Sequence, residues 1–107
     1  MDLWSEIKKL EGKTLTTLDQ GRSFEVLVVL NSGVVINPLR TKKERLVPWK
    51  QIEGAFRQLL ALGQITRSEI ETQHAPRNPV YVAAILAELP YVTHTIRPIV
   101  LYYKSAK

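Results

Sequence analysis

The hydrophobic pattern of this chain changes its period near Trp49, and that change most constrains what the chain can fold into. From Lys13 to Trp49 the apolar residues come in short runs rich in Val, Leu and Ile, separated by turn-forming residues, which is typical of strands. After Trp49 they recur every three or four residues, the spacing of one helix face. The sequence therefore predicts an α+β fold in which a small sheet precedes a group of helices.

The β-type half contains four runs, and the residues between them predict how the strands pair. Gly21 and Gly33 each follow polar turn-formers and supply the positive φ that a tight hairpin needs. We therefore expect the first three strands to form an antiparallel meander. The second run is apolar at successive positions from Val26 onward, which predicts a central strand covered on both faces. The four runs are 14–18, 24–30, 34–36 and 46–49.

A short helix is predicted ahead of these strands. Asp2 is a suitable N-cap, Leu3 and Ile7 recur at helical spacing, and Gly12 supplies a stop. Trp4 lies within this helix, and two interpretations apply to it: it packs inward, as large aromatic residues in small domains usually do, or it is an exposed anchor for a partner.

The second half predicts three helices followed by β structure. A first helix with an apolar stripe over 52–62 ends at Gly63. Thr66 and Glu69 have the spacing of a capping box, which predicts a second helix running to about residue 73. Asn78 and Pro79 are a typical cap and first residue for a third helix reaching about residue 88. Two β runs, 92–96 and 99–103, complete the chain.

Two stretches of this half resemble the winged helix-turn-helix superfamily: 59–70, LLALGQITRSEI, and 81–92, YVAAILAELPYV. In that family a leucine-rich helix ends at a glycine, a Thr-x-x-Glu-Ile segment opens the next helix, and an apolar helix precedes the wing. The resemblance covers about residues 50–103. It implies a single domain over 1–107, in which 1–49 form a helix and a β-meander and 50–107 form the winged-helix-like part.

The resemblance also implies a function and candidate residues for it. The family's usual mode places the third helix in a DNA major groove. Here the positions available for a limited reading of bases are Arg77, Asn78 and Tyr81. Arg97 lies at the tip of the expected wing, where it is either a contact to a minor groove or phosphate or an ordinary exposed turn residue.

The positive charge of the chain is concentrated in one segment. The chain carries 15 Lys and Arg against 10 Asp and Glu, a net charge of +5. Residues 40–50 carry five positive charges and one negative charge. Clustered Lys and Arg bind nucleic-acid backbones by releasing counterions, whereas the alternative is a solvated hairpin tip that discourages strand pairing. We expect duplex DNA as the partner, with phosphate contacts from Arg40, Lys42, Lys43 and Arg45.

A second interpretation rests on small side chains in the third helix. Ala83, Ala84 and Ala87 provide a face that would allow close packing, either on the N-terminal sheet or on another protein. Under this interpretation the chain is a protein-interaction adapter or a homodimerisation module. It could also be an accessory domain of an enzyme that acts on DNA. The fold class alone does not distinguish these functions.

The residues that usually carry catalysis are sparse. The chain has no cysteine and two histidines, His74 and His94, and its two aspartates, Asp2 and Asp19, are accounted for as a helix cap and a turn residue. No Gly-rich phosphate-binding motif occurs. We therefore expect a non-enzymatic protein without a metal or cofactor. Neither a secretory signal nor a membrane span is visible, so we expect a cytoplasmic protein with no membrane partner.

Overall fold

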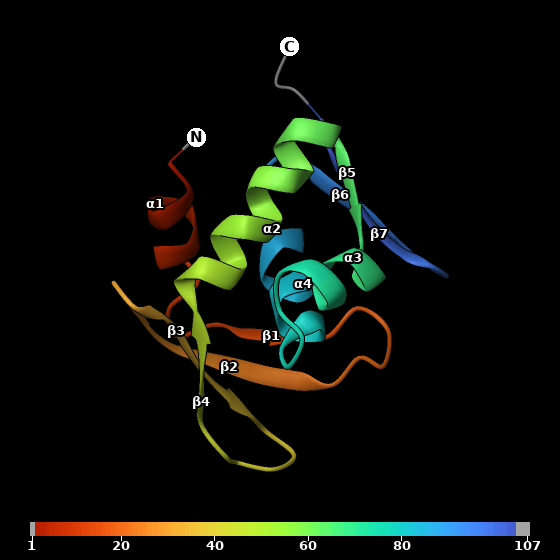
Figure 1. Cartoon of the computed structure of the whole chain (residues 1–107). Helices are drawn as coiled ribbons and strands as arrows, with labels where there is room; N and C mark the ends of the chain where they lie inside the picture. Colours follow the sequence, from red (N-terminus) through yellow and green to blue (C-terminus); the bar gives the residue numbers. More distant parts are fainter. Residues whose placement is uncertain (1, 105–107) are drawn as a thin grey trace.

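The computed structural model describes residues 2–104 and shows an α+β fold with four helices and two antiparallel sheets in that part of the chain (Figure 1). In chain order the elements are α1 (Leu3–Lys8), β1 (Thr14–Thr16), β2 (Ser23–Leu30), β3 (Gly33–Pro38), β4 (Arg45–Pro48), α2 (Trp49–Leu62), β5 (Gln64–Thr66), α3 (Arg67–Gln73), α4 (Pro79–Ala87), β6 (Val92–Ile96) and β7 (Ile99–Tyr103).

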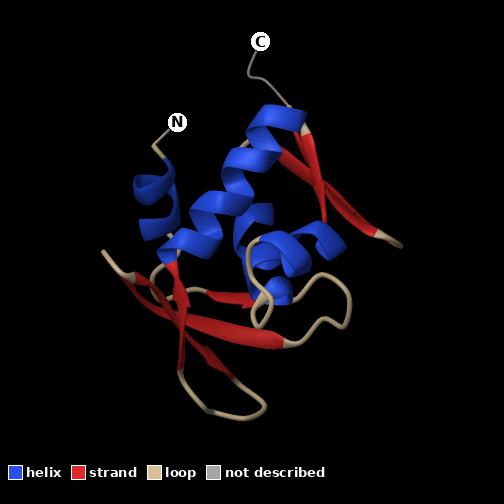
Figure 2. Ribbon diagram, viewed as in Figure 1, coloured by secondary structure: helices blue, strands red, loops and turns tan. Residues whose placement is uncertain are grey.

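The N-terminal sheet has the strand order β1-β2-β3-β4 with every pair antiparallel, so the predicted meander is confirmed. The prediction that β2 is covered on both faces is wrong. The helices lie on one side of this sheet (Figure 2), and Val28 and Val35, which pair on the outer side, are half-buried. A register shift between Val26 and Val28 returns Val29 to the inner face. The unbroken apolar run therefore reflects a β-bulge.

Gly33 opens β3 at a point where β4 approaches very closely. Its φ is +153°, and a Cβ built there would lie 2.2 Å from the carbonyl oxygen of Val47. Only glycine fits such an approach without moving the backbone of β4. The residue expected to serve the hairpin turn thus also sets the spacing of two strands.

The helix ends follow the sequence signals closely in the second half of the chain. Gly63 caps α2 in the left-handed conformation, and both bonds of the capping box between Thr66 and Glu69 are present at the start of α3. At the other end of the chain α1 stops at Lys8, before the predicted Gly12, and Asp2 makes no side-chain cap bond to the helix backbone. The boundaries set by a left-handed glycine or a capping box are therefore the ones that the sequence predicts best.

The C-terminal sheet has the order β5-β7-β6. The two β runs predicted at the end of the chain are present with the expected bounds, as β6 and β7. Strand β5, only three residues long, was not expected. It forms because Gln64–Thr66 pair with β7, a contact between residues almost 40 positions apart that local patterning does not report.

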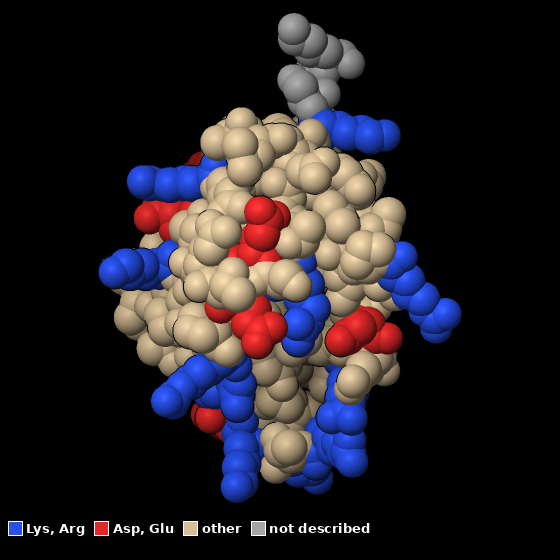
Figure 3. Space-filling view, turned by 45° about the vertical axis from the view of Figure 1, so that its right-hand side comes forward, with Lys and Arg blue, Asp and Glu red and all other residues tan. Residues whose placement is uncertain are grey.

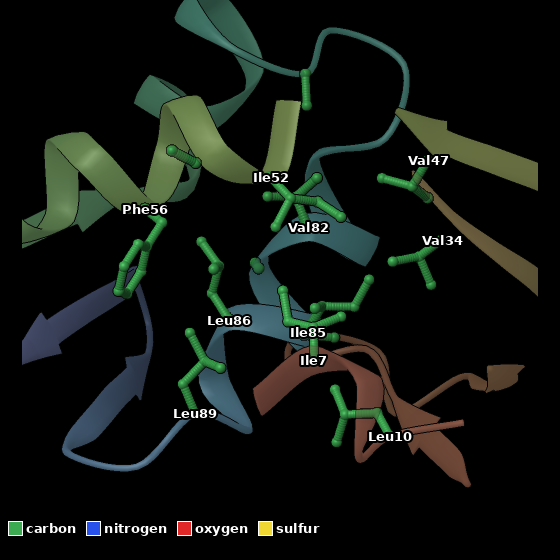
Figure 4. Packing of buried hydrophobic residues seen from close by; sticks show 14 of the residues in the cluster. Ile7, Leu10, Val34, Val47, Ile52, Phe56, Val82, Ile85, Leu86 and Leu89 are labelled. Atoms are coloured by element: carbon green, nitrogen blue, oxygen red, sulfur yellow. The ribbon is translucent and has the colours of Figure 1, made fainter. Parts of the chain in front are cut away.

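Helix α4 lies at the centre of the molecule and is apolar all round, so it is a core helix rather than a surface helix. Its Val82, Ile85 and Leu86 lie among side chains from both halves of the chain, including Ile7 and Val34 (Figure 4). The alanine face is turned to the core too, since Ala83 and Ala84 are only 1% and 2% exposed and Ala87 is half-buried against the same core. Those alanines therefore pack inside this chain's own core and offer no surface to another protein.

Trp4 is half-buried and packs against this core, in agreement with the inward interpretation of that residue. None of the helices between residues 2 and 104 combines the length and the apolar character that a membrane span requires.

Candidate nucleic-acid interface

Three loops bring six basic residues together at one edge of the molecule. We call this set the basic rim: Arg22, Arg40, Lys42, Lys43, Arg45 and Arg77. The β3–β4 loop and the start of β4 supply four of them. Arg22 joins them because the next residue, Ser23, accepts a backbone hydrogen bond from Leu39 at 3.1 Å. Sheet register thus places the end of the β1–β2 loop beside the start of the β3–β4 loop.

Arg45 connects the rim to the helical half. Its guanidinium donates hydrogen bonds to the carbonyl oxygen of Arg77 at 3.4 Å and to Oδ1 of Asn78 at 3.1 Å. It also lies over the ring of Tyr81, 5.3 Å from the ring centre, within the range of a cation–π contact. These contacts hold the α3–α4 loop against the sheet, so Arg77 lies near the β3–β4 loop despite being more than 30 residues away in sequence.

The rim carries most of the net charge of the protein. All six side chains are exposed, and their three loops contain two carboxylates, Asp19 and Glu44. The balance is +4, against +5 for the whole chain. Figure 3 shows Lys and Arg side chains gathered over the lower end of the molecule, the end at which the β3–β4 loop lies in Figure 1. The remainder of the molecule is nearly neutral.

Among residues 2–104, the four cations that have a carboxylate partner all lie outside the rim. Lys8, Lys9, Arg57 and Arg67 each form an ion pair with a glutamate on the same helix or at its end. Across residues 2–104 no rim side chain lies within 4 Å of a carboxylate oxygen in such a pair. The rim cations are therefore available to an anionic partner.

Two further cations lie elsewhere: Lys50, which belongs to the charged segment 40–50, and Arg97, which was expected at the interface. Lys50 follows β4 at the end opposite the β3–β4 loop. Arg97 is exposed in the turn between β6 and β7, which lies well apart from the β3–β4 loop in Figure 1. The structure thus groups five of the expected residues, Arg40, Lys42, Lys43, Arg45 and Arg77, and adds Arg22, which the sequence analysis missed.

A base-reading helix would expose Asn78 and Tyr81, whereas here Asn78 is buried and Tyr81 is half-buried. Asn78 is 7% exposed; its Nδ2 donates to Oε1 of Gln51 at 3.0 Å and its Oδ1 accepts from Arg45. It makes no side-chain cap bond. Tyr81 packs edge-on against Phe24, with ring centres 5.1 Å apart. Both side chains join α4 to its neighbours, because the N-terminal sheet covers the helix.

A pocket of about 480 Å³ lies between the first turns of α2 and the end of α3, lined by Pro48, Lys50, Gln51, Gly54, Gln73 and His74. His74 Nε2 is 2.7 Å from Oε1 of Gln58, so the imidazole is held by α2. In the part of the chain that the structure describes, no three His, Asp or Glu side chains gather closely enough to hold a metal ion.

Comparisons with known proteins found no relative of this chain. No protein-family model, no curated protein and no solved structure matches this chain.

Proposed function

We propose that this protein binds duplex DNA through the phosphate backbone, with the basic rim as the contact surface. The observation that carries the proposal is the concentration of +4 on one exposed edge, on cations without carboxylate partners. Neutralising several phosphates releases their counterions, which supplies most of the free energy of non-specific DNA binding.

We further propose that residues 49–103 form a winged-helix-like unit used as a scaffold. Two features support this. The element order α2, β5, α3, α4, β6, β7 runs helix, strand, helix, helix, strand, strand, and the sheet order is β5-β7-β6. Because the N-terminal sheet covers α4, this helix reads no bases in the proposed mode, so discrimination between DNA sequences should be weak.

The experiment is fluorescence anisotropy with two labelled duplexes of unrelated sequence. We expect similar affinities for both duplexes, and a loss of about tenfold or more at low salt for the Lys42→Ala/Lys43→Ala variant. A matched control, Lys9→Ala/Arg57→Ala, removes the same number of charges from exposed positions outside the rim. It should keep most of the affinity.

Equal losses in the two variants would mean that net charge alone drives binding and that the rim is not a site. A strong preference for one duplex, abolished by changes at α4, would contradict the backbone-only mode. Light scattering on the free protein separates a change in DNA affinity from a change in oligomeric state.

A further inference from the structure

Strand β6 is an unusual free edge. Each sheet has two edge strands, and between residues 2 and 104 three of these four strands are protected against pairing with a further strand. β1 and β5 have three residues each, and β4 carries Arg45 and Pro48. Short length, charge and proline are the usual protections against edge-to-edge pairing. β6 has five residues, Val92–Ile96, with neither a proline nor a Lys, Arg, Asp or Glu, and four of the five are exposed.

Three residues of β6 direct their backbone hydrogen-bonding groups away from β7. The amide of Lys104 donates to the carbonyl oxygen of Tyr91 at 2.8 Å, and these residues are opposite each other in the β6–β7 register. Groups on alternate residues of a strand point to opposite edges. Since the backbone groups of Tyr91 point toward β7, those of Val92, His94 and Ile96 point away from it. The amide of Val92 donates to the carbonyl oxygen of Leu89 at 3.3 Å, which leaves its carbonyl oxygen and both groups of His94 and Ile96 for a new ladder.

The order of residue types along β6 is the same in both chain directions. The sequence Val-Thr-His-Thr-Ile is apolar, Thr, His, Thr, apolar. A two-fold axis through His94 would place His94 opposite its own copy, Thr93 opposite Thr95, and Val92 opposite Ile96. Thr–Thr pairs and pairs of apolar side chains that face each other across two strands stabilise antiparallel pairing. No charge in the strand opposes its copy.

We propose that two copies of this chain pair through β6 in antiparallel fashion, with the two-fold axis at His94. The same outward backbone groups would form the ladder on both sides, as an isologous interface requires, and the two three-stranded sheets would become one sheet of six. This inference does not rest on the proposed DNA binding, because β6 and the basic rim share no residue.

The flanks of the strand fit this pairing. Ile96 is 50% exposed and lies opposite the buried Ile99 on the helix-facing side of the sheet, so a neighbouring Val92 would cover it. In the same register Arg97 of one copy lies opposite Tyr91 of the other. Tyr91 is 52% exposed, and a guanidinium over its ring would add a cation–π contact.

Sedimentation velocity from about 1 µM to about 1 mM tests the proposal. A five-residue strand pair is a small interface, so we expect a weak dissociation constant that lies between about 1 µM and about 1 mM, within the range of the measurement. The amide of His94 should exchange with deuterium more slowly at high protein concentration than at low concentration.

Two substitutions at the axis should abolish the dimer. His94→Pro removes an amide that points away from β7, so the β6–β7 ladder is kept, and His94→Lys places two like charges opposite each other. Leu62→Lys, which adds the same charge at an exposed position at the end of α2, should dimerise like the wild type. A cooperative unfolding transition in urea establishes that each variant is folded. If His94→Pro does not fold, His94→Lys alone tests whether β6 is the dimer interface.

A wild-type protein that stays monomeric over the whole range would overturn the proposal. So would a folded His94→Lys variant that dimerises as strongly as the wild type. Lys42→Ala/Lys43→Ala should dimerise normally, which keeps the outcome of this experiment separate from that of the DNA-binding experiment.

Discussion

At the scale of single residues, Gly54 in α2 shows how a neighbour determines the effect of a substitution. A Cβ at this position would lie 2.8 Å from Nδ1 of His74, whose Nε2 is paired with Gln58. Alanine in a helix is normally favoured over glycine by about 1 kcal/mol. Here it would displace the imidazole, and overpacking of this kind costs about 1–3 kcal/mol.

We therefore expect Gly54→Ala to lower the free energy of unfolding in the wild type by about 1 kcal/mol. In a His74→Ala background the same change should raise that free energy by about 0.5–1 kcal/mol. Urea unfolding of the four proteins in this cycle measures the difference. An effect of the same sign in both backgrounds would show that His74 does not restrict the position.

Glu11 joins the end of the first helical segment to β2. Its Oε2 accepts hydrogen bonds from Nζ of Lys8 at 2.8 Å and from the amide of Val29 at 2.6 Å. These two hydrogen bonds, that of Lys8 first, hold the pKa of the Glu11 carboxyl below its usual range, although partial desolvation acts in the opposite direction. The charged carboxylate therefore stabilises the folded state.

A carboxyl whose pKa is lower in the folded state contributes stability above its unfolded pKa of about 4.3 and loses it as the pH falls through the folded value. We expect the wild type to be more stable than Glu11→Gln above about pH 5, and the difference to shrink as the pH falls below about 4. Urea unfolding over a pH series measures it. A difference that is constant from neutral to acid pH would contradict this role.

At the scale of the elements, α4 determines which surfaces the molecule can use. Ala83 and Ala84 pack in the core, so a larger side chain at either position has no room. We expect Ala84→Leu to cost about 1–3 kcal/mol of unfolding free energy. Ala61→Leu, at an exposed position of α2, should change it by less than about 0.5 kcal/mol. If urea unfolding found Ala84→Leu as stable as the wild type, α4 would have an open face.

The sequence predicts the elements better than their surroundings. Periodicity, the Gly63 stop and the Thr66–Glu69 box act within one helix or turn, so α2, α3, β6 and β7 could be predicted. Whether α4 is central or exposed depends on the sheet that covers it, and an apolar helix with alanines suits a core as well as an interface. β5 and the bulge in β2 likewise depend on partner strands.

At the scale of the whole molecule, the candidate site follows from how three loops meet. Four members of the rim are neighbours in sequence and could be predicted from the charge count. Arg22 belongs to it only through the pairing of β2 with β3. Lys50, by contrast, is close to Arg45 in sequence but lies away from the rim. The extended strand β4 separates the two residues.

The dependence of DNA affinity on salt tests the central claim most directly. The logarithm of the binding constant for a duplex should fall with the logarithm of salt concentration with a slope of about −4.5, because about five phosphates would be neutralised. Removing Arg40, Lys42 and Lys43 by alanine substitution should make the slope less steep by about 3. A wild-type slope near zero, or a slope that these three substitutions leave unchanged, would contradict binding through the rim.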